Sequence, residues 1–149
     1  MDCPQIPWWP NAVTWVLLFF GWLVVHRATL ARERRKEKRE TANCAVNELR
    51  EIEKEAFEFH AAESFDDRKG SALRKRVERL INQLQRPPLV ALGIPVGRMI
   101  ALRSSITLNN ADLSNFTPQK SDSLILQSIC DAVDDLIEEI EASRDKCWT

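Results

Sequence analysis

Hydrophobic residues fill the start of the chain without interruption and then give way to an amphipathic pattern. Residues 8–25, WWPNAVTWVLLFFGWLVV, include no charged side chain. As a helix this segment would be about 27 Å long, close to the roughly 30 Å thickness of the hydrocarbon layer of a bilayer. The pattern therefore predicts a transmembrane helix over residues 8–25, preceded by a short extracytoplasmic segment, residues 1–7.

Two other structures could account for an apolar segment near the start of a chain. A core helix this uniformly apolar would need a large protein around it, whereas the rest of this chain is mostly amphipathic. A cleaved signal peptide would have basic residues before its apolar part and small residues after it. Here no Lys or Arg precedes the segment, and HRATL with dense charge follows it. We therefore favour an anchor that stays in the membrane.

After the apolar segment, hydrophobic residues recur at alternating steps of four and three, the spacing of helices with one buried face. No Gly or Pro occurs between Trp22 and Lys69, so one helix can continue from the membrane into the body, with packing from about Ala42. A second helix is expected to start in the turn at residues 64–67, or at Gly70, and to stop at Pro87-Pro88. The apolar positions of the two helices are Ala45, Leu49, Ile52, Ala56 and Phe59 in the first, and Leu73, Val77, Leu80, Ile81 and Leu84 in the second.

The second half of the body carries a further apolar stretch and a clear final helix. Residues 89–102 are too short to cross a membrane and favour a core helix that begins near Pro95; a re-entrant or membrane-surface segment is the alternative. Residues 103–123 are rich in Ser, Asn, Asp and Thr and predict a loop with a short turn at residues 112–115. The last helix is expected to start at Thr117-Pro118 or at Ser121. Its apolar positions are Leu126, Ile129, Val133, Leu136 and Ile140.

Together these patterns predict an all-α protein. A single N-terminal transmembrane helix continues into a stalk and then into an antiparallel bundle of about four helices, residues 42–149. The second body helix is basic and the last helix is acidic. We expect these two helices to be neighbours, because adjacent packing would pair their charges.

The net charge of −1 conceals a basic segment directly after the apolar one. Residues 26–41 form this juxtamembrane stalk, and positive flanks stay on the cytoplasmic side, so the body should be cytoplasmic. The membrane is therefore expected to be the cell (inner or plasma) membrane. The stalk either contacts anionic lipid headgroups or only fixes the topology. The residues predicted at the membrane interface are Trp8, Trp9, Trp22, Arg27, Arg32, Arg34, Arg35 and Lys36.

The sequence contains no motif that indicates an enzyme, a metal site or a cofactor site. Its four cysteines, Cys3, Cys44, Cys130 and Cys147, form no CxxC pair, and a cytoplasmic body would keep its thiols reduced. Cys44 and Cys130 lie beside the apolar helix faces and are expected to be buried or half-buried. His60 is expected at the surface or in a turn. We therefore predict no catalytic residue, no metal ligand and no cofactor.

These observations lead to a functional hypothesis, a single-pass membrane protein whose cytoplasmic helical body binds a protein partner or a second copy of itself. The alternative is a small membrane-acting effector, phage-encoded or defence-linked, that perturbs the bilayer or blocks transport. Nucleic acid is not expected as a partner, because the basic segment has no interleaved aromatics, and no small-molecule substrate is identified. The candidate partner-binding residues are Asp134, Glu138, Glu141 and Asp145.

Overall fold

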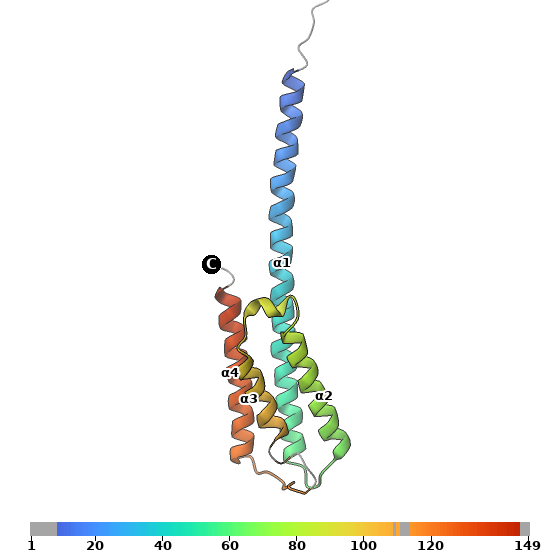
Figure 1. The fold of residues 1–149 in the computed structure, drawn as a ribbon, viewed down its shortest axis with the longest axis vertical. Coiled ribbons are helices and arrows are strands. Elements are labelled where there is room, and N and C mark those ends of the chain that lie inside the picture. The colour runs from blue at the N-terminus through green and yellow to red at the C-terminus, as the bar shows by residue number, and fades with distance from the viewer. Residues whose placement is uncertain (1–8, 109, 111–113, 147–149) are drawn as a thin grey trace, which may run out of the picture. The chain divides into compact units, whose positions relative to one another are not determined.

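The computed structural model describes residues 9–108, 110 and 114–146, and these residues are helical with short connections (Figure 1). The four α-helices within them are α1 (Trp9–His60), α2 (Asp67–Leu84), α3 (Val96–Thr107) and α4 (Leu124–Lys146), with a short 3₁₀ helix η1 (Leu89–Leu92) before α3. No strand occurs in the described part of the chain. The prediction of an all-α protein is confirmed.

The chain divides into two compact units, Met1–Glu37 and Lys38–Thr149. In the first unit, α1 carries its apolar side chains on the outside, with Trp15 and Trp22 72% and 60% exposed. It is the one helix in the described part of the chain that is long and apolar enough to cross a membrane.

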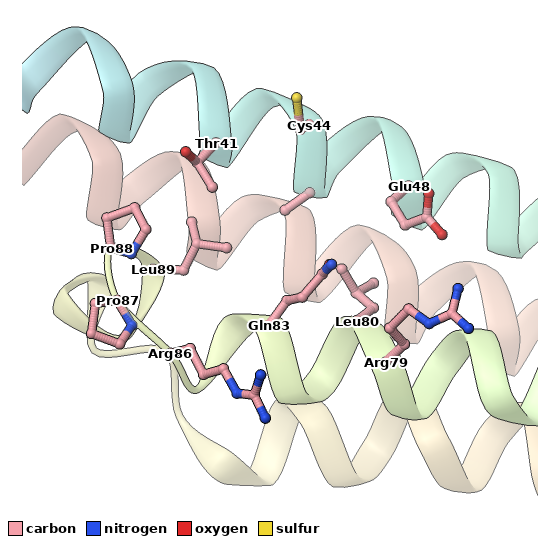
Figure 2. A pocket seen from close by; sticks show the side chains of 11 residues that line it. Thr41, Cys44, Glu48, Arg79, Leu80, Gln83, Arg86, Pro87, Pro88 and Leu89 are labelled. Carbon is pink, nitrogen blue, oxygen red and sulfur yellow. The ribbon is translucent and has the colours of Figure 1, made fainter.

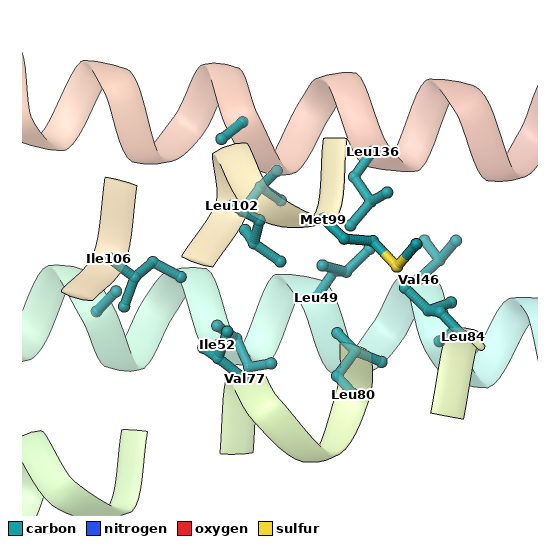
Figure 3. Close-up of a cluster of buried hydrophobic side chains, with 14 of the residues drawn as sticks. Val46, Leu49, Ile52, Val77, Leu80, Leu84, Met99, Leu102, Ile106 and Leu136 are labelled. Carbon is teal, nitrogen blue, oxygen red and sulfur yellow. The ribbon is translucent and has the colours of Figure 1, made fainter. Parts of the chain in front are cut away.

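The second unit is built around a single apolar core. Within it, α2 runs back along the C-terminal part of α1, α3 runs opposite to α2, and α4 runs opposite to α3 (Figure 1). Large aliphatic side chains from all four helices meet between them (Figure 3). The core starts at Ala42, as predicted. Of the predicted apolar positions, Ile81 is partly buried and the others are buried.

The ends of α2 follow the local sequence. Asp66 caps its N-terminus, where Oδ1 accepts hydrogen bonds from the backbone N–H groups of Arg68 (3.0 Å) and Lys69 (3.2 Å). The helix ends before Pro87-Pro88, because proline lacks a donor and disfavours helical geometry in the preceding residue. Both boundaries agree with the prediction.

The α3 helix begins after Pro95, as predicted, but it continues to Thr107, so the expected loop at residues 103–107 is wrong. Ile106 is buried and gives this segment an apolar face, which its polar composition did not indicate. Its hydroxyl groups are satisfied within the helix, since Ser105 Oγ donates to the Leu102 carbonyl at 2.9 Å and Thr107 Oγ1 to the Arg103 carbonyl at 2.7 Å. Residues 112 and 113 of the expected turn lie outside the described residues.

The α4 helix starts at Leu124, later than either position expected from the sequence. Ser123 Oγ accepts a hydrogen bond from the Leu126 N–H group at 3.2 Å. The preceding segment is held by tertiary contacts instead. Phe116 packs against the ring of Phe59 (centroids 5.7 Å apart), and the Gln119 N–H group donates to the His60 carbonyl at 2.8 Å.

Ion pairs join the helices in an order that differs from the expected pairing of α2 with α4. Arg76 of α2 pairs with Glu48 and Glu55 of α1. Glu78 of α2 pairs with Arg103 of α3, and Asp135 of α4 pairs with Arg98 of α3. Among the described ion pairs, α2 therefore finds its carboxylate partners on α1, and α4 finds its base on α3.

Candidate functional site

The first candidate site is the exposed apolar surface of α1 between Val13 and Val25. Aromatic side chains mark its end: the Trp22 ring stacks on His26 with centroids 5.1 Å apart and planes 7° apart, and Phe19 lies 6.2 Å from Trp22. The Thr29 hydroxyl donates to the Val25 carbonyl at 2.9 Å, so this polar group is satisfied within the helix. The surface carries no charge and offers only apolar and aromatic contacts.

Along the sequence, the residues predicted at the membrane interface fall before, within and after this apolar surface. Trp22 and the predicted basic residues are exposed in the structure. Trp9 is the first residue of α1, but its side chain lies outside the described residues, as does the whole of Trp8. The structure therefore places an apolar surface directly before a basic one along α1. The exposed basic residues are Arg27, Arg32, Arg34, Arg35 and Lys36.

The second candidate site is the outward face of α4. Asp134, Glu138 and Glu141 are exposed, and steps of four and three place them together on the side away from the buried positions. Asp131, one turn earlier, extends the same face. The side chain of Asp145 lies outside the described residues. The three described candidates thus share one acidic face.

A basic face on α2 points away from the core, whereas the sequence predicted that the bases of this helix pair with the acids of α4 within one chain. Arg68, Lys75 and Arg79 are exposed and follow one another at steps of seven and four. At 100° per residue these positions point away from the core positions of α2, such as Val77. That spacing was the available signal, because it puts like charges on one face, although Glu78 lies beside Lys75 and Arg79.

An open pocket of about 520 Å³ lies between α1 and α2 (Figure 2). It includes Thr41 and Cys44 of α1, Arg79 and Gln83 of α2 and Arg86 after the end of α2, and the Pro87–Leu89 turn closes one end. The pocket combines one thiol with basic and amide groups and the carboxylate of Glu48, and its lining includes no imidazole. Three or more clustered His, Cys, Asp or Glu side chains that could hold a metal do not occur within the described residues.

The prediction for His60 is wrong, because its side chain is fully buried at the end of α1. Asn110 lies beside it, with its Nδ2 atom 3.4 Å from His60 Nδ1, while no hydrogen bond of ordinary geometry reaches Nε2. Burial lowers the pKa of His60 below its usual value, and the Ile106 backbone opposes the shift in part. The imidazole is therefore a neutral core group near pH 7, and its role is structural.

The two cysteines in the described residues have opposite surroundings. Cys44 is exposed, so the expectation that it is buried or half-buried is wrong. Cys130 is half-buried, as expected, and its Sγ donates to Glu53 Oε1 at 3.2 Å. Burial and the neighbouring carboxylates, Glu53 first, raise the pKa of Cys130 to about 11. Its thiol is thus protonated and poorly nucleophilic near neutral pH.

Comparison with protein families, curated proteins and solved structures finds no significant match to this chain.

Proposed function

We propose that the chain is a single-pass membrane protein whose helical bundle recognises a protein surface on the cytoplasmic side. The observation that carries the proposal is the apolar surface of α1, where Trp15, Leu17 and Val25 are each more than 60% exposed. Exposed apolar area of this extent is unfavourable in water and favourable in a bilayer. A bilayer is therefore the surrounding that best suits residues 8–25.

The orientation of the proposal comes from charge. Basic side chains follow the apolar segment within two residues, and no Lys or Arg precedes it. Lys and Arg near a span remain on the cytoplasmic side. The antiparallel bundle from residue 42 onward would then lie in the cytoplasm, and residues 1–7 would lie outside.

Two features support binding as the role of the bundle. The outer faces of α2 and α4 carry charge of opposite sign, and the three bases on the α2 face and the four carboxylates on the α4 face are exposed. The described residues also supply no nucleophile with an adjacent base; the only His of the bundle is buried, and the Cys130 thiol is protonated. Charged faces of this kind steer and align a macromolecular partner.

Membrane topology is tested with a thiol reagent that does not cross membranes. Full-length chains retain either Cys3 or Cys44 as the only cysteine, with the others replaced by Ser. We expect Cys3 to be labelled in intact cells and Cys44 to be labelled only after lysis. Since Cys44 is exposed in the structure, protection in intact cells would reflect the membrane rather than burial. Labelling of Cys44 in intact cells, or recovery of the chain in the soluble fraction, would contradict the proposal.

Binding is tested separately by crosslinking in the membrane, extraction in detergent and analysis of what co-purifies at native expression. We expect a discrete crosslinked species of defined mass. Reversing the α4 charges with Asp134→Lys and Glu138→Lys should remove it. A chain that stays monomeric and retains no partner would rule out the binding role but leave the membrane anchor intact.

A further inference from the structure

We propose that the partner is a second copy of this chain, and that the basic face of α2 on one copy packs against the acidic face of α4 on the next. The inference rests on the proposed function, since it names the surface that the bundle would recognise. The basic face consists of Arg68, Lys75 and Arg79, and the acidic face of Asp131, Asp134, Glu138 and Glu141.

The two faces cannot meet within one chain. In Figure 1 the α2 and α4 helices lie on opposite sides of the bundle, with α3 and the C-terminal part of α1 between them. The ion pairs agree, because Arg76 joins α2 to α1 and Asp135 joins α4 to α3. The two faces therefore do not neutralise each other in a single copy, where, among the described interactions of these faces, only Arg79 interacts with a carboxylate of another helix, Glu48 across the pocket between α1 and α2. Each face also keeps like charges one turn apart, which is unfavourable in an isolated helix.

The helix directions suit copies that share one membrane. Both α2 and α4 run opposite to the C-terminal part of α1, so they run parallel to each other (Figure 1). Anchored copies have the same orientation and can be related only by sideways displacement or by rotation about the membrane normal. Sideways displacement keeps the α2 helix of one copy parallel to the α4 helix of its neighbour.

Contacts with α1 also show which residues of α2 and α4 lie at the same position along the bundle axis. Arg76 of α2 bonds to Glu48 and Glu55, so it lies level with the midpoint of those residues on α1. Cys130 of α4 bonds to Glu53. Because α4 runs opposite to α1, the level of Arg76 corresponds to about residue 132 on α4.

A second contact gives the other limit of this alignment. Arg144 of α4 lies 3.3 Å from the side-chain oxygen of Asn43 on α1. If this contact is used for the alignment instead, the α4 residue that is level with Arg76 lies about four residues further toward the C-terminus. At one limit Lys75 is level with Asp131, and at the other with Asp134. Both helices repeat their charges at steps of three, four or seven, so at either limit Lys75 and Arg79 each lie level with an α4 carboxylate to within about one residue, or ~1.5 Å, whereas Arg68 falls before Asp131.

The resulting contact is heterologous, since each copy offers α2 on one side and α4 on the other. Such contacts form rings when the rotation closes and open rows when it does not. Exposed ion pairs are individually weak. Confinement to one membrane raises the effective concentration of the copies, so a modest interface is sufficient for assembly.

Cysteine crosslinking in the membrane tests the geometry. Two differently tagged full-length chains without native cysteines are co-expressed, one with Lys75→Cys and the other with Asp134→Cys, and treated with a short bifunctional thiol reagent. We expect a crosslinked pair that contains both tags, and at least about tenfold less product when both chains carry Lys75→Cys. Equal yields with Lys75→Cys on both chains would overturn the heterologous contact, as would a strong product from Arg50→Cys, an exposed α1 position, with Asp134→Cys.

Charge reversal tests the chemistry of the contact. Lys75→Glu with Arg79→Glu should reduce co-purification of the two tagged chains roughly tenfold. Asp134→Lys with Glu138→Lys in the neighbouring chain should restore it. The matched control is Arg50→Glu with Lys54→Glu, an exposed basic pair with the same spacing on α1. An equal loss from the control, or no rescue, would overturn the proposal.

Two further measurements separate this inference from the proposed function. Membrane fractionation and Cys44 labelling are performed on the otherwise unmodified chain. A chain that is anchored with its body inside but yields no α2–α4 product overturns only the inference. A chain recovered in the soluble fraction overturns the proposed function itself.

Discussion

The side-chain amide of Asn110 lies 3.4 Å from the imidazole of His60 in the protein interior, across fifty residues of sequence. Asn110 also accepts a hydrogen bond from the Thr117 N–H group at 2.6 Å and donates one to the Thr117 carbonyl at 2.9 Å, which fixes the orientation of its amide. Its Nδ2 group therefore faces His60 Nδ1 as a donor, and the neutral imidazole carries its proton on Nε2.

This arrangement predicts that stability declines with mild acid. The pKa of His60 is lowered in the folded protein, so above about pH 6.5 both states are neutral and its stabilisation is complete. As pH falls below that value the unfolded chain binds a proton that the folded chain resists. We expect a loss of up to about 2 kcal/mol between pH 6.5 and pH 5, measured by denaturation of the full chain in detergent.

His60→Gln is the control for this pH dependence. It removes the titrating group, so the stability of the variant should be nearly flat over the same range even if the variant is less stable overall. A slope equal to that of the wild type would show that another group causes the pH dependence.

Two glycines should respond in opposite ways to substitution by alanine. A Cβ atom at Gly70 would lie 3.1 Å from two ring atoms of Phe59, and that ring is held edge-on by Phe65 and Phe116. We expect Gly70→Ala to reduce the free energy of unfolding by about 1–2 kcal/mol. At Gly97 nothing lies within 4 Å, so Gly97→Ala should stabilise by about 0.5–1 kcal/mol through helix propensity. Equal effects in urea denaturation would contradict the predicted ring contact.

Replacing Arg76 by Lys should weaken the contact between α1 and α2. The guanidinium bonds to both carboxylate oxygens of Glu48, at 2.5 and 3.1 Å, and to Glu55, and Lys cannot reproduce this fork. Because these groups are partly exposed, we expect a cost of about 1 kcal/mol. Arg103→Lys is the matched control, since Arg103 makes a single bond to Glu78 and is 59% exposed. Both variants are compared with the wild type by thermal denaturation. The expected loss in the free energy of unfolding for Arg103→Lys is below about 0.5 kcal/mol.

Thiol reactivity should distinguish Cys130 from Cys44. Burial and nearby carboxylates raise the pKa of Cys130 from 9.0 to about 11, so its thiolate fraction at pH 8 is about 100-fold below that of an ordinary thiol. Alkylation of full-length chains that retain one of the two cysteines should be about 100-fold faster at exposed Cys44. Glu53→Gln removes a contributing charge and should speed the reaction of Cys130. A Cys130 rate that matches Cys44 would contradict the buried, carboxylate-flanked environment.

The helices and most of the core follow from local sequence, because burial of one face leaves a regular spacing of apolar residues. Leu49, Val77 and Leu136 each follow that spacing, and each is buried. The apolar segment and the exposed acidic residues of α4 could also be read directly, since both are local in sequence. The Pro pair gave the end of α2 for the same reason.

Which helices are neighbours, and which polar or thiol side chains depart from the predicted burial, depends on tertiary contacts. Charge favoured α2 beside α4, yet Arg76 binds carboxylates of α1, because apolar packing determines which helices adjoin and surface ion pairs contribute little. His60 is buried because Phe59 and Asn110 close around the end of α1, and Cys44 is exposed although an apolar face adjoins it. These outcomes depend on contacts between residues far apart in sequence, which spacing within one helix does not encode.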